Sequence, residues 1–174
     1  MKFIDANVFY CRYSHPSFDG YEEFSAPNLM TLEGMMYAIS ASLGNGPQIE
    51  NWFVALKDDT GDPFDASATY AAPGFVEITG SYDEATRPAW NVGGAYVSES
   101  VVKIDNSGSW MEFNFNTSDT IHGLSVLGGG FDPNVKGDTA GGGTMYSLAN
   151  FEELKNVTAG GKLEILYVAG GKNE

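Results

Sequence analysis

The pattern of apolar and polar positions predicts one helix near the start of the chain. Within residues 28–43, apolar side chains recur at positions i, i+3, i+4, i+7 and i+11, which places them on one helical stripe. Asn28 or Thr31 is suited to cap the start, and Gly44 stands where a helix commonly ends. We expect this stripe to pack into the core. It consists of Leu32, Met35, Met36, Ile39 and Leu43.

Most of the remaining chain consists of short runs typical of β-strands. Residues 52–56 form an uninterrupted apolar run, which favours a central buried strand. Within 110–116 and 162–168, apolar residues alternate with polar ones, as in strands with one buried face. The inward positions are Met111, Phe113, Phe115, Leu163, Ile165 and Tyr167. Further strands are expected at 75–79, 82–87, 97–104, 121–127 and 145–151, with a hairpin turn at 105–108.

These elements predict a mainly β protein: an antiparallel β-sandwich or jelly-roll-like barrel with one α-helix and an extended N-terminal arm. A length of 174 residues with 43% hydrophobic residues favours a single core. Cys11 is the only cysteine, so no intramolecular disulfide contributes. We therefore divide the chain into an arm, residues 1–27, and a β-sandwich domain, residues 28–174.

The expected arm is rich in aromatic residues but has no clean period of 2 or 3.6, and two proline-containing turns interrupt it. Such a segment cannot form a core alone, so it must lie on another surface. It is either a strand of its own domain or an arm on a neighbouring subunit, and both alternatives stay open. Its aromatic residues are Phe3, Phe9, Tyr10, Tyr13, Phe18, Tyr21 and Phe24. For the second alternative we predict partner-binding roles for Phe3, Phe9, Tyr10, Tyr13 and Phe18.

The formal net charge of −14 restricts the classes of partner. Such a field repels phosphate, so nucleic acids and anionic membranes are not expected partners. No apolar run is long enough for a signal peptide or a membrane span, which indicates a protein made in a cytoplasm.

No catalytic motif stands out. His122 lies in a strand pattern without a nearby acid, so we interpret it as structural, and Cys11 as a small buried apolar residue. Arg87 is expected to pair with an acid of its own domain. Among the tryptophans, only Trp90, close to Pro88, is expected to be exposed, and an aromatic groove for sugars has no other support. We predict no catalytic residue and no cofactor.

Residues 50–86 carry the strongest local charge, with eight acids against the single Lys57. Four aspartates there could offer oxygen ligands to Ca²⁺, but their spacing does not match a calcium-binding loop. We therefore expect a solvated acidic loop and no metal site. The four are Asp58, Asp59, Asp62 and Asp65.

Four segments in this order resemble a family of small structural proteins of tailed bacteriophages. They are Asn-Leu-Met-Thr-Leu-Glu-Gly at 28–34, Trp-Phe-Val-Ala-Leu at 52–56, Tyr-Asp-Glu-Ala-Thr-Arg-Pro at 82–88 and Ile-His-Gly-Leu at 121–124. The match covers about residues 28–127, and the family's members resemble capsid cement, or decoration, proteins of short-tailed phages.

The resemblance implies a non-enzymatic virion protein that binds the outer surface of the phage head and stabilises it. Its expected partners are the major capsid protein and further copies of itself, as a homo-dimer or homo-trimer. The expected location is the capsid surface. Two alternatives stay open: a receptor- or carbohydrate-binding head-fibre or tail module, and a β-sandwich hydrolase that uses acids of residues 50–86.

Overall fold

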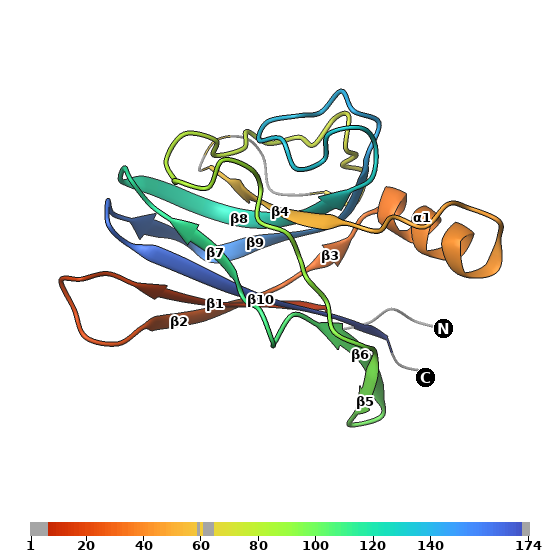
Figure 1. Ribbon diagram of the computed structural model, residues 1–174, viewed down its shortest axis with the longest axis horizontal. Helices are drawn as coiled ribbons and strands as arrows, with labels where there is room; N and C mark the ends of the chain where they lie inside the picture. The colour runs from red at the N-terminus through yellow and green to blue at the C-terminus, as the bar shows by residue number, and fades with distance from the viewer. Residues whose placement is uncertain (1–6, 59, 61–64, 172–174) are drawn as a thin grey trace.

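The computed structural model describes residues 7–58, 60 and 65–171, which form two antiparallel β-sheets packed face to face (Figure 1). One sheet has six strands in the order β2-β1-β10-β6-β5, with β7 also paired to β10, and the other has four in the order β3-β9-β8-β4. The prediction of a mainly β, sandwich-like fold with one helix in the described residues is confirmed. The strands are β1 (Val8–Ser14), β2 (Glu22–Pro27), β3 (Leu29–Met30), β4 (Trp52–Lys57), β5 (Tyr96–Ser98), β6 (Val101–Asp105), β7 (Met111–Asn114), β8 (Asp119–Gly128), β9 (Thr144–Val157) and β10 (Lys162–Gly171).

The core fills the space between the two sheets, because each strand turns alternate side chains inward. All six inward positions expected in 110–116 and 162–168 are buried, as predicted. The facing sheet contributes aliphatic residues of β4, β8 and β9, including Val54, Leu56, Leu124, Val126 and Ala149.

The N-terminal region belongs to the domain's own sheet. Strand β1 lies between β2 and β10, with Cys11 opposite Phe24 on one side and Ile165 on the other. Of the two alternatives, this region therefore takes the first: residues 8–14 and 22–27 are strands of their own domain. The alternation was hidden because an aromatic residue, Tyr10, occupies the outward face between buried Phe9 and Cys11.

The helix α1 (Leu32–Leu43) forms where the sequence predicts it, and Thr31 caps its start by accepting a hydrogen bond from the Gly34 N–H at 2.8 Å. The prediction that its large apolar stripe packs into the core is wrong. Of the five stripe residues only Met35 is partly buried, and the other four are exposed: Leu32, Met36, Ile39 and Leu43. In the described part of the chain, no helix combines the length and apolar character needed to cross a bilayer.

The helix packs through its opposite side, which carries small residues. A Cβ placed on Gly34 would lie 2.2 Å from the backbone oxygen of Tyr146, so only glycine permits this close approach to β9. Ala38 and Ala41 continue the same side toward Trp52. A close helix-to-sheet contact therefore selected the small residues, and it left the large ones outside.

Two expected strands are absent from the described structure. Residues 75–79 and 82–87 form only isolated bridges, at Glu77 with Lys57 and at Tyr82 with Phe115. Strand β4 is buried as predicted, but it lies at the edge of its sheet. Segment 76–90 covers that edge, for example through the Ile78 N–H, which donates to Leu56 O at 2.9 Å.

The expected strand at 97–104 is a hairpin, and the expected hairpin at 105–108 is not one. Strands β5 and β6 pair across Glu99 and Ser100, both of which have positive φ. Beyond Asp105 the chain continues along the same neighbour, because β6 and then β7 pair with successive parts of β10. Pairing with the long strand β10 therefore determines the chain direction here. The turn-like sequence at 105–108 does not reverse the chain.

Candidate functional site

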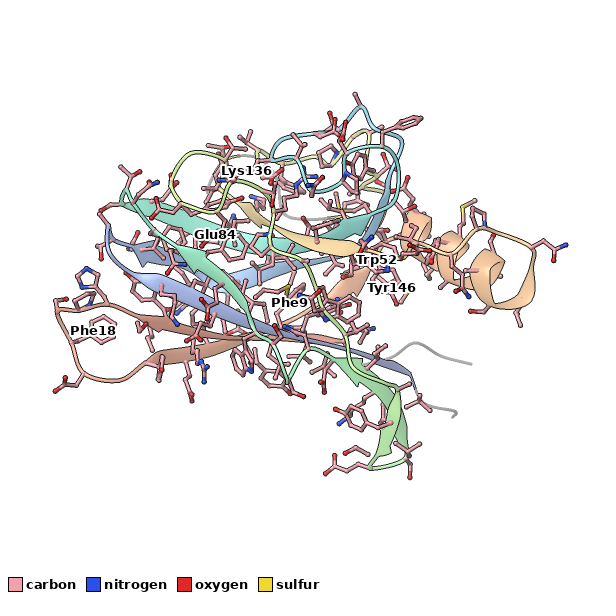
Figure 2. All side chains as sticks on the ribbon, in the orientation of Figure 1. Phe9, Phe18, Trp52, Glu84, Lys136 and Tyr146 are labelled. Atoms are coloured by element: carbon pink, nitrogen blue, oxygen red, sulfur yellow. The ribbon has the colours of Figure 1, made fainter. Side chains whose placement is uncertain are left out.

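The structure separates the predicted partner-binding residues into buried and exposed ones. Phe9 and Tyr13 point into the core, where Phe9 stacks on Tyr167 at 4.4 Å between ring centroids (Figure 2). Neither is available to a partner of the folded chain, which corrects that part of the prediction. Tyr10 and Phe18 are exposed, at 46% and 42%. Phe3 lies outside the described residues.

Tyr10 belongs to a hollow on the outer surface of the six-stranded sheet, with a volume of about 460 Å³. Strand register brings its walls together: Tyr10 lies opposite Ser25 of β2 and Leu166 of β10, and Arg12 lies opposite Glu23. We call the group Tyr10, Arg12, Tyr21, Trp110 and Leu166 the aromatic face. Sequence reasoning missed it because its members come from four separate segments.

Arg12 is the polar centre of the aromatic face. Its guanidinium carbon lies 4.2 Å from the centroid of the Trp110 ring and 4.9 Å from that of Tyr21, both within cation–π range. Its Nε and Nη2 donate to the Glu164 carboxylate at 3.0 and 3.1 Å. A guanidinium has five N–H donors, so the described residues leave several for a bound partner.

Glu164 holds Arg12 in place as an ionised carboxylate. Burial opposes its charge, but hydrogen bonds from Arg12 and Lys162 outweigh this, so the pKa of Glu164 lies below its usual value. Lys162 Nζ lies 3.3 Å from Glu164 and 3.5 Å from Glu112. The outer sheet surface therefore presents aromatic rings beside a fixed, partly neutralised charge network.

The expectation for the tryptophans is reversed. Trp90 is buried, because its backbone N–H donates to Trp52 O at 2.8 Å and so fixes it on the edge of β4, with its ring 4.8 Å from that of Tyr167. Trp110 is partly exposed on the aromatic face. Proximity to a proline was thus a poor signal of exposure.

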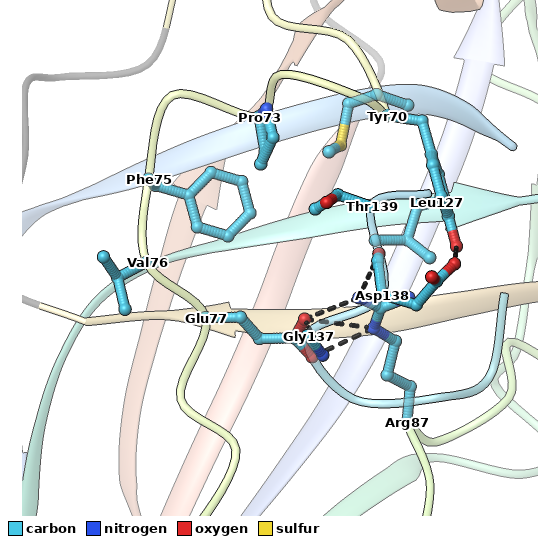
Figure 3. A pocket seen from close by; sticks show the side chains of 11 residues that line it. Tyr70, Pro73, Phe75, Val76, Glu77, Arg87, Leu127, Gly137, Asp138 and Thr139 are labelled. Carbon is cyan, nitrogen blue, oxygen red and sulfur yellow. Dashed lines mark hydrogen bonds and ion pairs between the residues drawn. The ribbon is translucent and has the colours of Figure 1, made fainter. Parts of the chain in front are cut away.

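A second hollow, of about 300 Å³, lies where residues 70–77 meet the loop after β8 (Figure 3). Arg87 forms the base of this hollow and binds Glu77, with Nη2 to Oε2 at 2.6 Å. This confirms the prediction that Arg87 pairs with an acid of its own domain. Arg87 also donates to the carbonyls of Pro133 and Asp138 at 2.8 and 3.1 Å. These bonds of Arg87 connect residues 77–87 to the loop after β8, so the residues at the base of this hollow hold that loop in place.

Tyr70 closes the other side of this second hollow. Its hydroxyl donates to Asp138 Oδ2 at 2.7 Å. Burial, together with that hydrogen bond to Asp138, raises the pKa of Tyr70 to about 12. The same bond is the main reason that the pKa of Asp138 is lowered.

The candidate catalytic groups are held in structural contacts. His122 Nδ1 lies 3.2 Å from the buried Lys57 Nζ, and His15 Nδ1 lies 2.6 Å from Ser17 Oγ. Cys11 is buried, and this burial raises the pKa of its thiol far above the usual value. The His15 and Ser17 side chains contact each other within the exposed turn between β1 and β2, where the other ring nitrogen of His15 lies 3.1 Å from Ala159 O.

In the described part of the acidic segment, the aspartates also make local structural hydrogen bonds. Asp58 and Asp65 accept hydrogen bonds from the nearby Thr60 and Ser67, at 2.7 Å (Thr60 Oγ1) and 2.6 Å (Ser67 N–H). Asp59 and Asp62 lie outside the described residues. Within residues 7–58, 60 and 65–171, no three His, Cys, Asp or Glu side chains gather closely enough to hold a metal ion.

No family model, curated protein or solved structure matches this chain.

Proposed function

We propose that this chain is a non-enzymatic structural protein of a virion head, which binds the outside of the shell and stabilises it. The resemblance of residues 28–127 to small phage structural proteins motivates this proposal. The observation that carries it is the aromatic face, which exposes Tyr10, Tyr21 and part of Trp110 around a fixed arginine. Tyrosine, tryptophan and arginine are the side chains that most often dominate protein-binding energy.

The partner at this face is the major capsid protein. The β1–β2 hairpin carries Tyr10, Phe18 and Tyr21 on a framework paired to β10, so binding does not require the chain to order new backbone. Pre-formed surfaces retain more of their contact energy on binding. The net charge of −14 also suits the outside of a shell, away from packaged DNA.

A co-sedimentation assay with empty heads assembled from the cognate capsid protein tests this proposal. We expect the wild-type chain to sediment with the heads, and Tyr10→Ser to bind at least tenfold more weakly. Phe131→Ser is the matched control, because Phe131 is 92% exposed but lies in the loop after β8. Failure of the wild-type chain to sediment with heads overturns the proposal. Equal binding by Tyr10→Ser removes the aromatic face as the contact.

A second candidate is a saccharide-binding virion module, and the same hollow is the observation that favours it. The Tyr10 ring can stack on an apolar sugar face, while Arg12 and Ser25 offer hydrogen-bonding groups beside it. A glycan array separates the two functions. Saccharide binding that Tyr10→Ser abolishes, with no sedimentation on heads, favours this candidate, and the reverse result favours the shell protein.

A further inference from the structure

Helix α1 has two apolar sides, and only one of them is covered. The outer stripe, which we define as Leu32, Met36, Ile39 and Leu43, is exposed by 54, 71, 56 and 86%, respectively. At 100° per residue these four positions lie within about 60° of one another. The packing side, with Gly34, Ala38 and Ala41, is centred on the opposite side. The helix therefore displays its larger apolar residues to solvent, where an unbound protein gains nothing from them.

The helix is held firmly at its first turn. The Thr31 hydroxyl donates to Met145 O, and the Glu33 carboxylate accepts from the N–H groups of Tyr70 and Met145 at 2.8 and 2.5 Å. Tyr37 also packs edge-on against Trp52, at 5.2 Å between ring centroids. Helix α1 thus projects from one end of the sandwich on a fixed support (Figure 1), and Trp52 and Tyr146, which its packing side contacts, lie at its base (Figure 2).

Charged residues are sparse in the sequence of the helix and its flanks. Glu33 is the only charged residue between 28 and 49 in a chain of net charge −14, and its carboxylate is bound to the backbone of the sheet. Two copies of so acidic a protein repel each other over most of their surfaces. The exposed Glu50 lies with Ala38 and Ala41, on the side of the helix opposite to the stripe, so a second copy can approach the stripe with few carboxylates nearby.

We propose that two copies of this chain pair through the outer stripe, with the helices antiparallel about a two-fold axis. The stripe is symmetric about its midpoint, between Met36 and Ile39. Antiparallel pairing therefore sets Leu32 against the partner's Leu43 and Met36 against the partner's Ile39. The two helix dipoles then also oppose each other favourably. Because a two-fold contact uses the same patch on both copies, it closes as a dimer.

The apolar surface is of the size that a weak dimer needs. The four exposed fractions amount to more than two and a half whole side chains per copy. If every exposed part of these side chains is covered, two copies together remove at most about 1,000 Å² from water, which is the lower limit for a specific interface. We therefore expect a dimer that depends on protein concentration. This contact is separate from the aromatic face, so it can fail while shell binding holds.

Sedimentation equilibrium of the full chain tests the pairing. We expect a monomer–dimer equilibrium for the wild type, and Met36→Glu to raise the dimer dissociation constant at least tenfold with unchanged circular dichroism. Leu154→Glu is the matched control, because Leu154 is 48% exposed on β9, away from the helix, and it should leave the constant unchanged. A wild-type chain that stays monomeric at all concentrations overturns the proposal, as does equal weakening by both variants.

Oxidative cross-linking tests the antiparallel arrangement. The native Cys11 is 3% exposed, so an introduced thiol is the reactive one. We expect a mixture of Met36→Cys and Ile39→Cys chains to form the mixed disulfide. Leu32→Cys alone should not cross-link to itself, because antiparallel pairing holds the two positions about 16 Å apart along the axis. Efficient cross-linking of Leu32→Cys to itself contradicts the proposed arrangement. If the introduced thiols are protected from reaction only when the chain is bound to heads, and no dimer forms in solution, the outer stripe binds the shell protein and not a second copy.

Discussion

Two arginine–glutamate pairs in this molecule have the same chemistry and opposite uses. Arg87 is 2% exposed and its partner Glu77 8%, and Arg87 also donates to two backbone carbonyls. Arg12 is 30% exposed, binds Glu164 through two N–H groups, and lies against aromatic rings on the outer sheet surface.

The difference shows how location determines what an ion pair does. In the second hollow Arg87 donates both to Glu77 and to the carbonyls of Pro133 and Asp138, so the pair fixes the loop after β8. On the aromatic face the pair orients Arg12 but does not exhaust its donors. A buried pair is costly to break, whereas a partly exposed one contributes little to folding and remains available for binding.

Substitution of each arginine by methionine is the most severe test of this contrast. Arg87→Met leaves the Glu77 carboxylate buried without its partner, so we expect a loss of about 3–5 kcal/mol in the free energy of unfolding. For a chain of this size that lowers the melting temperature by about 6–20 °C. Arg12→Met should cost about 1 kcal/mol or less, because Arg12 is partly solvated and Lys162 still pairs with the buried Glu164 at 3.3 Å. Urea unfolding of both variants measures the difference, and similar losses would contradict the comparison.

The pH dependence of the Glu164 contribution to stability gives a second test of the partly exposed pair, with a smaller expected effect. The pKa of Glu164 is lowered in the folded state, so its ionisation stabilises the fold above the unfolded value of about 4.5. That contribution is lost as the pH falls through the folded-state pKa. We expect Glu164→Gln to cost about 1 kcal/mol at pH 7 and progressively less as the pH falls below the unfolded value. Urea unfolding at pH 7, 5, 4 and 3 measures this, and a cost independent of pH would show that packing is responsible.

A third substitution tests whether the ion pair or the hydroxyl anchors the loop after β8. Tyr70→Phe removes the 2.7 Å hydrogen bond to Asp138 but leaves the bonds from the Ala140 and Gly141 N–H groups. We expect a loss of about 1 kcal/mol by thermal unfolding. A loss as large as that of Arg87→Met would mean that Tyr70, not Arg87, holds the loop.

How far the sequence predicted the structure depended on whether the pattern was local. The alternation at Met111, Phe113 and Phe115 identified a strand and its buried face, because a period of two has one interpretation. The stripe on α1 identified the helix but not its orientation, since periodicity groups residues without saying which group is covered. The aromatic face could not be predicted, because Arg12 and Trp110 meet only through the pairing of β1 and β7 with β10.

The sequence by itself determined the mainly β character, the position of the helix and the strand faces with clean alternation. These follow from local periodicity, which fixes the type of element and, in an alternating strand, which residues share a face. Only the tertiary structure decided that β1 pairs within its own sheet, that Gly34 turns the helix's small side inward, and that Arg87 binds Glu77. Those outcomes depend on register and close approach between distant segments, which no local pattern encodes.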